Sequence, residues 1–100
     1  MHLKYFRTYE LAVKLYHCCK EQRLSPFLKD QLLRASSGIA LCLAEGSAKP
    51  GKKDKLRYYH IALGSLREIQ AILDLEEKDL IGIKEPVDQL GAHLYRLCKQ

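Results

Sequence analysis

Apolar residues recur at intervals of three and four along nearly the whole chain, and this spacing constrains the fold more than any other feature. Residues spaced in this way lie on one face of an α-helix, which has about 3.6 residues per turn. The clearest stripe consists of Leu28, Leu32, Ala35, Ile39 and Leu43. Three further stripes are Phe6, Tyr9, Val13 and Tyr16; Tyr59, Ala62, Leu66, Ile69 and Leu73; and Val87, Leu90, Leu94 and Leu97. The sequence therefore predicts an all-α protein.

Proline, glycine and serine mark the expected ends of these helices. Ser25 is a good N-cap and Pro26 suits the first helical position. Gly46 is typical of a C-terminal stop, and Pro86 of a new start. We expect helices from about Lys4 to Gln22, Ser25 to Gly46, Lys52 to Glu77, and from Pro86 onward.

The links between the four expected helices are short, which favours antiparallel neighbours and an up-down-up-down four-helix bundle. One hundred residues correspond to a single domain, spanning 1–100. No apolar run approaches the ~20 residues that span a bilayer, and the N-terminus lacks an apolar signal segment. We therefore expect a cytoplasmic protein without membrane contact.

The stretch from Lys49 to Arg57 holds nearly all of the net positive charge. Five basic side chains face one acid, a local charge of +4 in a chain of net charge +5. Such a cluster between two helices is typical of a surface that binds a polyanion. The alternative is an ordinary solvated loop. The candidate nucleic-acid-binding residues are Lys49, Lys52, Lys53, Lys55 and Arg57, with Lys4 and Arg7 from the chain start.

The predicted topology separates the charges along the bundle. The second link and both chain ends would lie at one end, and the first and third links at the other. The basic end would hold Lys4, Arg7, Lys49, Lys52, Lys53, Lys55, Arg57, Arg96 and Lys99. The other end would hold Asp74, Glu76, Glu77, Asp79, Glu85 and Asp88. We therefore expect a bundle that is basic at one end and acidic at the other.

The four cysteines do not form a metal-binding pattern. Cys18 and Cys19 are adjacent, Cys42 and Cys98 are isolated, and no Cys-x-x-Cys pair occurs. We expect reduced thiols, no metal and no cofactor. His17 beside the cysteine pair does not indicate a nucleophile, because sequence neighbours on a helix do not face each other. Ser65 follows Gly64 outside any Gly-x-Ser-x-Gly elbow, which favours helix packing.

A pattern in residues 31–73 resembles a known family of four-helix-bundle proteins, encoded within intervening sequences of large-subunit ribosomal RNA genes. Its elements are Gln31-Leu32-Leu33-Arg34-Ala35-Ser36, Ile39, Ala44-Glu45-Gly46, Lys52-Lys53-Asp54, Arg57-Tyr58, Ile61-Ala62-Leu63-Gly64-Ser65-Leu66 and Glu68. The chain departs from the family at Ala40 and Cys42, where Pro and Asn are usual, and at Leu33 and Gln70.

This resemblance implies a homo-oligomer, with a pentamer as the expected state. The same superfamily includes the accessory variability protein of diversity-generating retroelements, a basic pentamer that binds nucleic acid and a reverse transcriptase. A reverse transcriptase is therefore a possible partner here. The ribosomal and retroelement subgroups both stay open, as does the choice between RNA and DNA.

The polar positions that match the family pattern include Arg34, Glu45 and Glu68. We interpret these as a structural ion-pair network between helices or across subunits, because no nucleophile or metal cluster accompanies them. Tyr59 belongs to an apolar stripe and is expected in the core. Tyr58 is expected to be buried or at a subunit contact, and His60 to be exposed; base stacking is the less favoured alternative for these rings.

The sequence thus predicts a non-enzymatic, nucleic-acid-binding accessory protein. Its basic oligomeric surface would contact RNA or DNA phosphates. The alternative is a structural or protein-interaction oligomer without a nucleic-acid role.

Overall fold

The computed structural model describes residues 3, 6–76, 80 and 82–100, and within them it contains α-helices and no β-strand. The all-α class predicted from the apolar spacing is confirmed for this part of the chain. The predicted helix start at Lys4 lies outside the described residues. The helices are α1 (Arg7–Lys20), α2 (Pro26–Ser47), α3 (Lys52–Leu75) and α4 (Lys84–Cys98).

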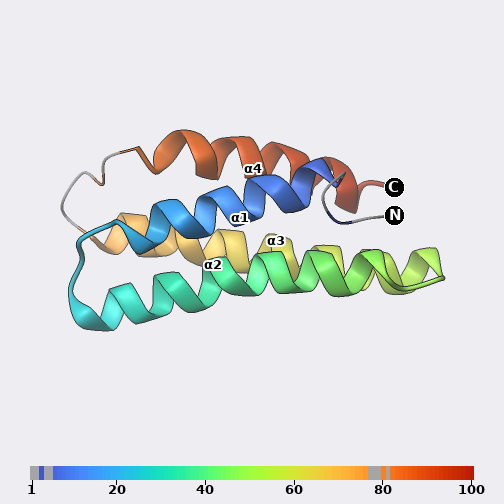
Figure 1. Cartoon of the computed structure of the whole chain (residues 1–100), viewed down its shortest axis with the longest axis horizontal. Helices are drawn as coiled ribbons and strands as arrows, with labels where there is room; N and C mark the ends of the chain where they lie inside the picture. Colours follow the sequence, from blue (N-terminus) through green and yellow to red (C-terminus); the bar gives the residue numbers. More distant parts are fainter. Residues whose placement is uncertain (1–2, 4–5, 77–79, 81) are drawn as a thin grey trace.

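Each helix packs mainly against the helices that precede and follow it, and α4 also packs against α1. The most extensive contact is between α2 and α3. Figure 1 shows both chain ends at the same end of an elongated molecule, which measures 41 × 21 × 20 Å. The turn between α2 and α3 lies at that end as well (Figure 1).

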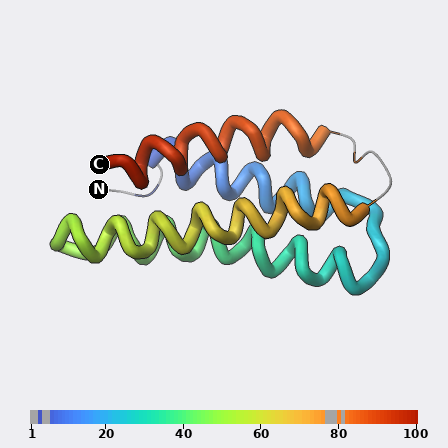
Figure 2. The backbone as a smooth tube through the Cα atoms, turned by 180° about the vertical axis from the view of Figure 1, so that it is seen from behind, coloured from blue at the N-terminus to red at the C-terminus, as the bar shows by residue number. Residues whose placement is uncertain are grey.

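The two central helices are longer than the outer two. The lengths of α2 and α3 are 22 and 24 residues, against 14 and 15 for α1 and α4. At 1.5 Å per residue the difference is roughly 10–15 Å. The α2–α3 turn therefore projects beyond the start of α1 and the end of α4, as Figure 2 shows from behind. We call residues 45–58 the α2–α3 tip.

The core lies between the four helices and is almost wholly aliphatic. Burying apolar side chains here stabilises the fold by roughly 25 cal/mol for each Å² of surface removed from water. The stripe predicted for α1 does not coincide with the buried face of that helix, since Tyr9, Val13 and Tyr16 are only half-buried. Tyrosines favour such rim positions, where the phenol keeps access to water. The fully or almost fully buried residues include Leu11, Ala12, Leu15, Cys19, Leu32, Ile39, Leu43, Ala62, Leu66, Ile69, Leu90 and Leu94.

Three of the predicted helix signals act differently from expectation. Ser25 precedes α2, but its side chain makes no capping hydrogen bond. Gly46 does not end α2, which continues to Ser47 with Ala48 as its C-cap. Pro86 does not begin α4, which starts two residues earlier at Lys84. A proline is tolerated in the first turn because an N–H there has no helical partner.

The other expected boundaries hold within about two residues. α1 ends at Lys20 rather than Gln22, and α3 ends at Leu75, since Glu76 is extended with φ −81° and ψ 124°. Within the described residues, no helix has both the length and the apolar character needed to cross a membrane.

Candidate nucleic-acid interface

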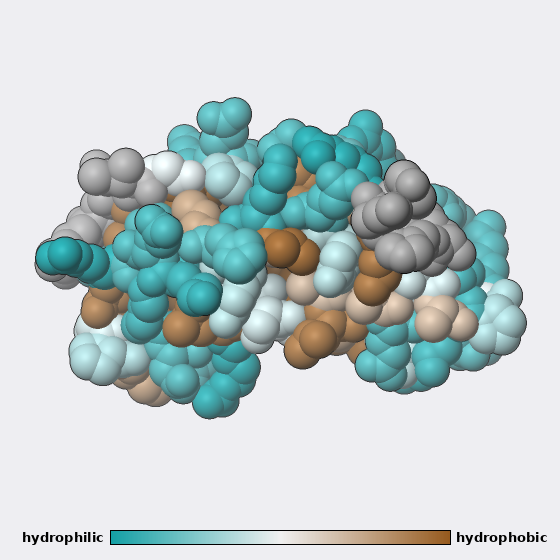
Figure 3. Space-filling model, viewed as in Figure 1, coloured by the Kyte–Doolittle hydropathy of each residue, from teal (hydrophilic) through white to brown (hydrophobic). Residues whose placement is uncertain are grey.

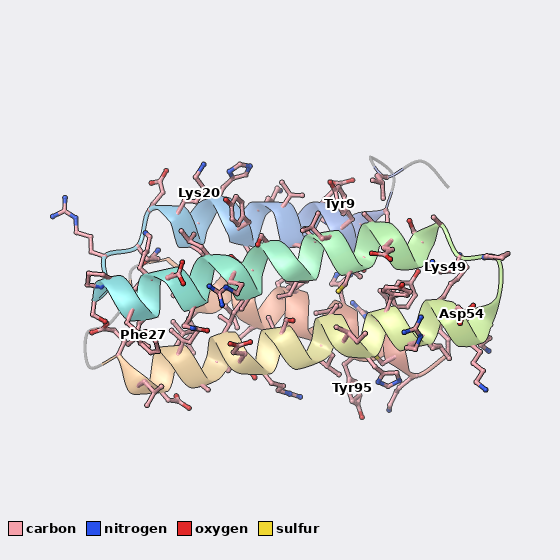
Figure 4. The ribbon with its side chains drawn as sticks, turned by 90° about the horizontal axis from the view of Figure 1, so that it is seen from below. Tyr9, Lys20, Phe27, Lys49, Asp54 and Tyr95 are labelled. Carbon is pink, nitrogen blue, oxygen red and sulfur yellow. The ribbon has the colours of Figure 1, made fainter. Side chains whose placement is uncertain are left out.

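The basic residues of the α2–α3 tip are presented to solvent. Lys52 and Lys53 are exposed and make no ion pair or hydrogen bond within the described part of the chain. Arg57 is exposed and Lys49 is half-buried. Lys55 differs, because its Nζ donates a hydrogen bond to the carbonyl oxygen of Ser47 at 2.9 Å. Lys55 thus ties the start of α3 to the end of α2, and four cations remain for a ligand. Figure 4 labels Lys49 and Asp54 at this tip.

The position of Lys52 and Lys53 is electrostatically unfavourable for the isolated chain. They open α3, and cations at a helix N-terminus oppose its dipole by roughly 0.3–1 kcal/mol each. The N-cap is Gly51, which has no side chain to satisfy the free N–H groups, and the acid in the first turn is Asp54. An anion bound at the tip would reverse this unfavourable term.

Tyr58 lies among the tip cations. Its hydroxyl donates a hydrogen bond to Glu45 Oε2 at 2.8 Å. Lys49 Nζ lies 5.2 Å from the ring centroid, and Arg57 Cζ lies 4.9 Å from it. Both distances fall within the ≈ 6 Å range of cation–π attraction. The structure therefore gathers two cations of the predicted site around one ring, and it places Tyr58 half-buried at the surface rather than in the core.

Gly46 lets the two helices approach closely enough to form this arrangement. A Cβ added at Gly46 would lie 2.8 Å from Tyr58 Cβ and 3.1 Å from Tyr59 Cε1. Tyr59 itself is buried, as predicted, and its ring lies 6.2 Å from that of Phe6. His60 is exposed, also as predicted.

A second basic group lies at the chain ends. Arg7 is exposed and pairs with Glu10 at 3.4 Å, so its charge is partly neutralised. Burial, followed by the charges of Arg96 and Arg7, lowers the pKa of His93. Lys4 lies outside the described residues.

A groove of about 240 Å³ lies between the start of α3 and the end of the chain. Lys52 and Lys55 of α3 line it together with Leu97 and Gln100 from the end of the chain. Its base is apolar, formed by Phe6, Leu56 and Tyr59. The groove thus brings two lysines of the tip beside uncharged residues at the end of the chain, and neither Arg7 nor Arg96 lines it.

The opposite end of the molecule carries bases as well as acids. Among the described residues there, six are acidic, Glu21, Asp30, Asp74, Glu76, Glu85 and Asp88, and four are basic, Lys20, Arg23, Lys29 and Lys84. The predicted excess of acids is therefore present but is smaller than the acids alone suggest. Glu77 and Asp79 lie outside the described residues.

The polar residues predicted to form a network do not meet within one chain. Arg34 pairs with Asp30 on its own helix at 3.0 Å. Glu45 accepts the Tyr58 hydrogen bond, and Glu68 is exposed on α3. A network across subunits stays a prediction. Glu45 and Glu68 are both exposed.

The thiols have the character of packing residues. Burial raises the pKa of Cys19 to about 11, despite a hydrogen bond with Ser36. Burial also raises the pKa values of Cys42 and Cys98. A thiol at neutral pH is a poor nucleophile and metal ligand. Among the described residues, no group of three or more His, Cys, Asp or Glu side chains is placed to hold a metal ion.

Lys29 has a role that the sequence did not indicate. Its Nζ donates to the carbonyl oxygens of Cys19 at 3.1 Å and Lys20 at 2.7 Å, and also to that of Gln22. These carbonyls lie at or just beyond the C-terminus of α1, where the helix no longer supplies N–H partners, and that of Cys19 also accepts the Gln22 N–H at 3.2 Å. The signal was absent from the sequence because the contact crosses from α2 to α1. Lys29 is therefore a structural cation rather than a ligand-binding one.

Comparison with known proteins gives one match. A family model described as 23S rRNA-intervening sequence protein matches residues 4–100. Searches of curated proteins and of solved structures found no match. The matched range covers all four helices and both basic groups.

Proposed function

Because this chain belongs to the 23S rRNA-intervening sequence protein family, we propose that it is a non-enzymatic protein that binds nucleic-acid phosphates through its α2–α3 tip. The observation that carries this proposal is the pair Lys52 and Lys53, which are exposed and unpaired within the described residues at the most projecting part of the molecule. Lys49 and Arg57 belong to the same tip, and Arg7 adds a cation at the start of α1. Such contacts give affinity that depends strongly on salt and weakly on base sequence.

The proposal includes assembly into a homo-oligomer, with a pentamer as the expected state. In each subunit the four helices would follow an antiparallel up-down-up-down course, consistent with the chain ends in Figure 1. Repeating the tip around a ring would let weak phosphate contacts add through multivalency. The partnership with a reverse transcriptase, implied by the resemblance to retroelement proteins, stays a prediction.

Exposed apolar side chains support the assembly. Four of the five exposed large hydrophobic residues of the described chain lie on α2 and α3: Phe27, Leu41, Ile61 and Leu75. Figure 3 shows hydrophobic atoms reaching the surface over α2, in the lower half of that view. The same observation favours the second candidate function, a protein-interaction oligomer without a nucleic-acid role. Self-association that weakens with salt in the absence of nucleic acid would favour that alternative.

A salt titration of binding tests the proposed function. The wild-type protein and the double variant Lys52→Glu/Lys53→Glu are compared on a structured RNA and a duplex DNA. We expect the wild type to show a log–log salt slope of several units, and the variant to bind at least about tenfold more weakly with a slope smaller by roughly two. Acids at a helix N-terminus are favourable, so the variant should fold.

The matched control is Lys14→Glu/Lys84→Glu, which makes the same change in net charge at exposed positions away from the tip. An equal loss in the control would show that net charge alone matters and would contradict the site. An absence of binding by the wild type, even at low salt, would contradict the function.

A further inference from the structure

We propose that Tyr58, held by Glu45, positions Lys49 and Arg57 as a preformed pair of cations for the phosphates of one nucleic-acid strand. The inference rests on the proposed function and adds a positioning residue to it. It also assigns the Tyr58 ring to the protein's own cations rather than to base stacking.

The geometry of the tip supports this role. The hydrogen bond from the Tyr58 hydroxyl to Glu45 Oε2 (2.8 Å) fixes the far end of the side chain. The Lys49 ammonium and the Arg57 guanidinium lie 5.2 and 4.9 Å from the ring centroid. The two charges are therefore within about 10 Å of each other. That separation lets them engage one phosphate or two neighbouring phosphates of a strand.

The backbone fixes both partners of the ring. Lys49 follows the end of α2, where its amide donates to the carbonyl oxygen of Gly46 at 3.1 Å. Gly46 in turn lies so close to Tyr58 that an added Cβ would be 2.8 Å from Tyr58 Cβ. The ring belongs to α3 and Lys49 to the link that follows α2, and this close approach sets their relative position. Arg57 is adjacent to Tyr58 on α3.

An acid inside a basic surface would normally weaken anion binding, so the partner of Glu45 matters. Glu45 accepts a hydrogen bond from a neutral phenol and forms no ion pair with Lys49 or Arg57. Among the described residues, neither cation is therefore held in an ion pair, and both can contact a ligand. Ordering a long side chain before binding reduces the entropy lost when the ligand arrives.

Binding to strands with and without bases distinguishes a positioning role of Tyr58 from base stacking. The test compares wild type, Tyr58→Leu and Tyr58→Phe on a fluorescent single-stranded oligodeoxynucleotide and on an abasic strand of the same length. An RNA strand of matching sequence completes the set. Tyr58→Leu removes the ring, and we expect binding about three- to tenfold weaker on all three strands. Because no charge changes, the salt slope should stay that of the wild type.

Tyr58→Phe retains the ring and loses the bond to Glu45, so we expect a smaller loss of the same kind. It also keeps the inference testable if Tyr58→Leu fails to fold. The matched control is Tyr16→Leu, since Tyr16 carries Lys20 at 5.6 Å but lies on α1, away from the tip. We expect its binding to equal that of the wild type.

Two results would overturn the inference. A loss confined to the strands that have bases would show stacking. No loss on any strand, with Lys52→Glu/Lys53→Glu still weakening binding, would remove the positioning role and leave the proposed function intact. If neither the tip lysines nor Tyr58 affects binding, the proposed function itself fails.

Discussion

At the scale of single residues, the tip depends on a side chain that is absent. Gly46 is buried in α2, and α3 passes so close that a methyl group there would overlap Tyr58. Its neighbour Glu45 then reaches the Tyr58 hydroxyl. The Ala-Glu-Gly segment therefore has a structural role. Gly46 lets α2 and α3 approach each other, and Glu45 anchors the Tyr58 ring.

We expect Gly46→Ala to destabilise the protein. The overlap with Tyr58 Cβ at 2.8 Å involves an atom attached directly to the α3 backbone, so the helices must shift apart. Overpacking costs about 1–3 kcal/mol, which outweighs a gain of up to about 1 kcal/mol from helix propensity. Urea denaturation at a fixed protein concentration would measure the change.

Gly64 provides the control for this variant. It is exposed within α3, and an added Cβ would meet nothing within 4 Å. We expect Gly64→Ala to stabilise the protein by roughly 0.5–1 kcal/mol. If both variants stabilise it, the close approach at Gly46 is not a constraint on the folded state.

At the scale of elements, the link between α1 and α2 is held by a cross-helix cap. Lys29 lies one turn into α2 and binds carbonyl oxygens at the end of α1. A cation at a helix C-terminus also interacts favourably with the dipole. The contact thereby ties together two helices that are joined by only the five residues 21–25.

We expect Lys29→Met to lower the free energy of unfolding by about 1.5–3 kcal/mol. Methionine retains the apolar stem but loses charge-assisted hydrogen bonds, and the carbonyls remain partly buried. Lys14→Met on the exposed face of α1 is the control and should change stability by less than about 0.5 kcal/mol. Equal effects in urea denaturation would show that the carbonyls are satisfied equally well by water.

At the scale of the whole molecule, the large apolar residues exposed on α2 and α3 lie at two heights along this helix pair. Gly38 faces Ser65 across the helix pair, its added Cβ lying 4.0 Å from Ser65 Oγ. Leu41 and Ile61 each lie about one helical turn nearer the tip than this pair, so they lie at the same height along the two helices. Phe27 and Leu75 each lie about three turns farther from the tip, which places them together at a second height. Figure 4 labels Phe27 near the end of the molecule opposite Lys49.

We expect these residues to be covered by other subunits of the proposed oligomer. The variant Leu41→Gln/Ile61→Gln should dissociate to the monomer at micromolar concentration, because burying each such side chain contributes about 1.5–3 kcal/mol. Sedimentation velocity would measure the change. Tyr95 lies on α4 and is 50% exposed. The variant Tyr95→Gln removes an apolar ring from this other helix, so it should leave the oligomer intact. An unchanged mass for the double variant would place the subunit contact on another face.

The sequence locates clusters of charged residues, but it does not show which partners they bind. The cluster at Lys49–Arg57 can be located by counting along the chain. However, the chain gave no sign that Lys55 would bind Ser47 or that Lys29 would cap α1. The excess of acids at the far end is smaller than expected, because the bases of the α1–α2 link and of α4 were not placed there in advance.

The sequence by itself determined the all-α class, the approximate helix boundaries, most of the core and the position of the basic stretch. These follow from the period of the apolar residues and from turn-forming residues, which act over a few neighbours. The tertiary structure alone decided that Gly46 serves close packing instead of termination, that Arg34 and Glu45 take separate partners, and that Tyr58 gathers Lys49 and Arg57. Those outcomes depend on the distance and rotation between α2 and α3, which the packing of the whole core sets and no local pattern encodes.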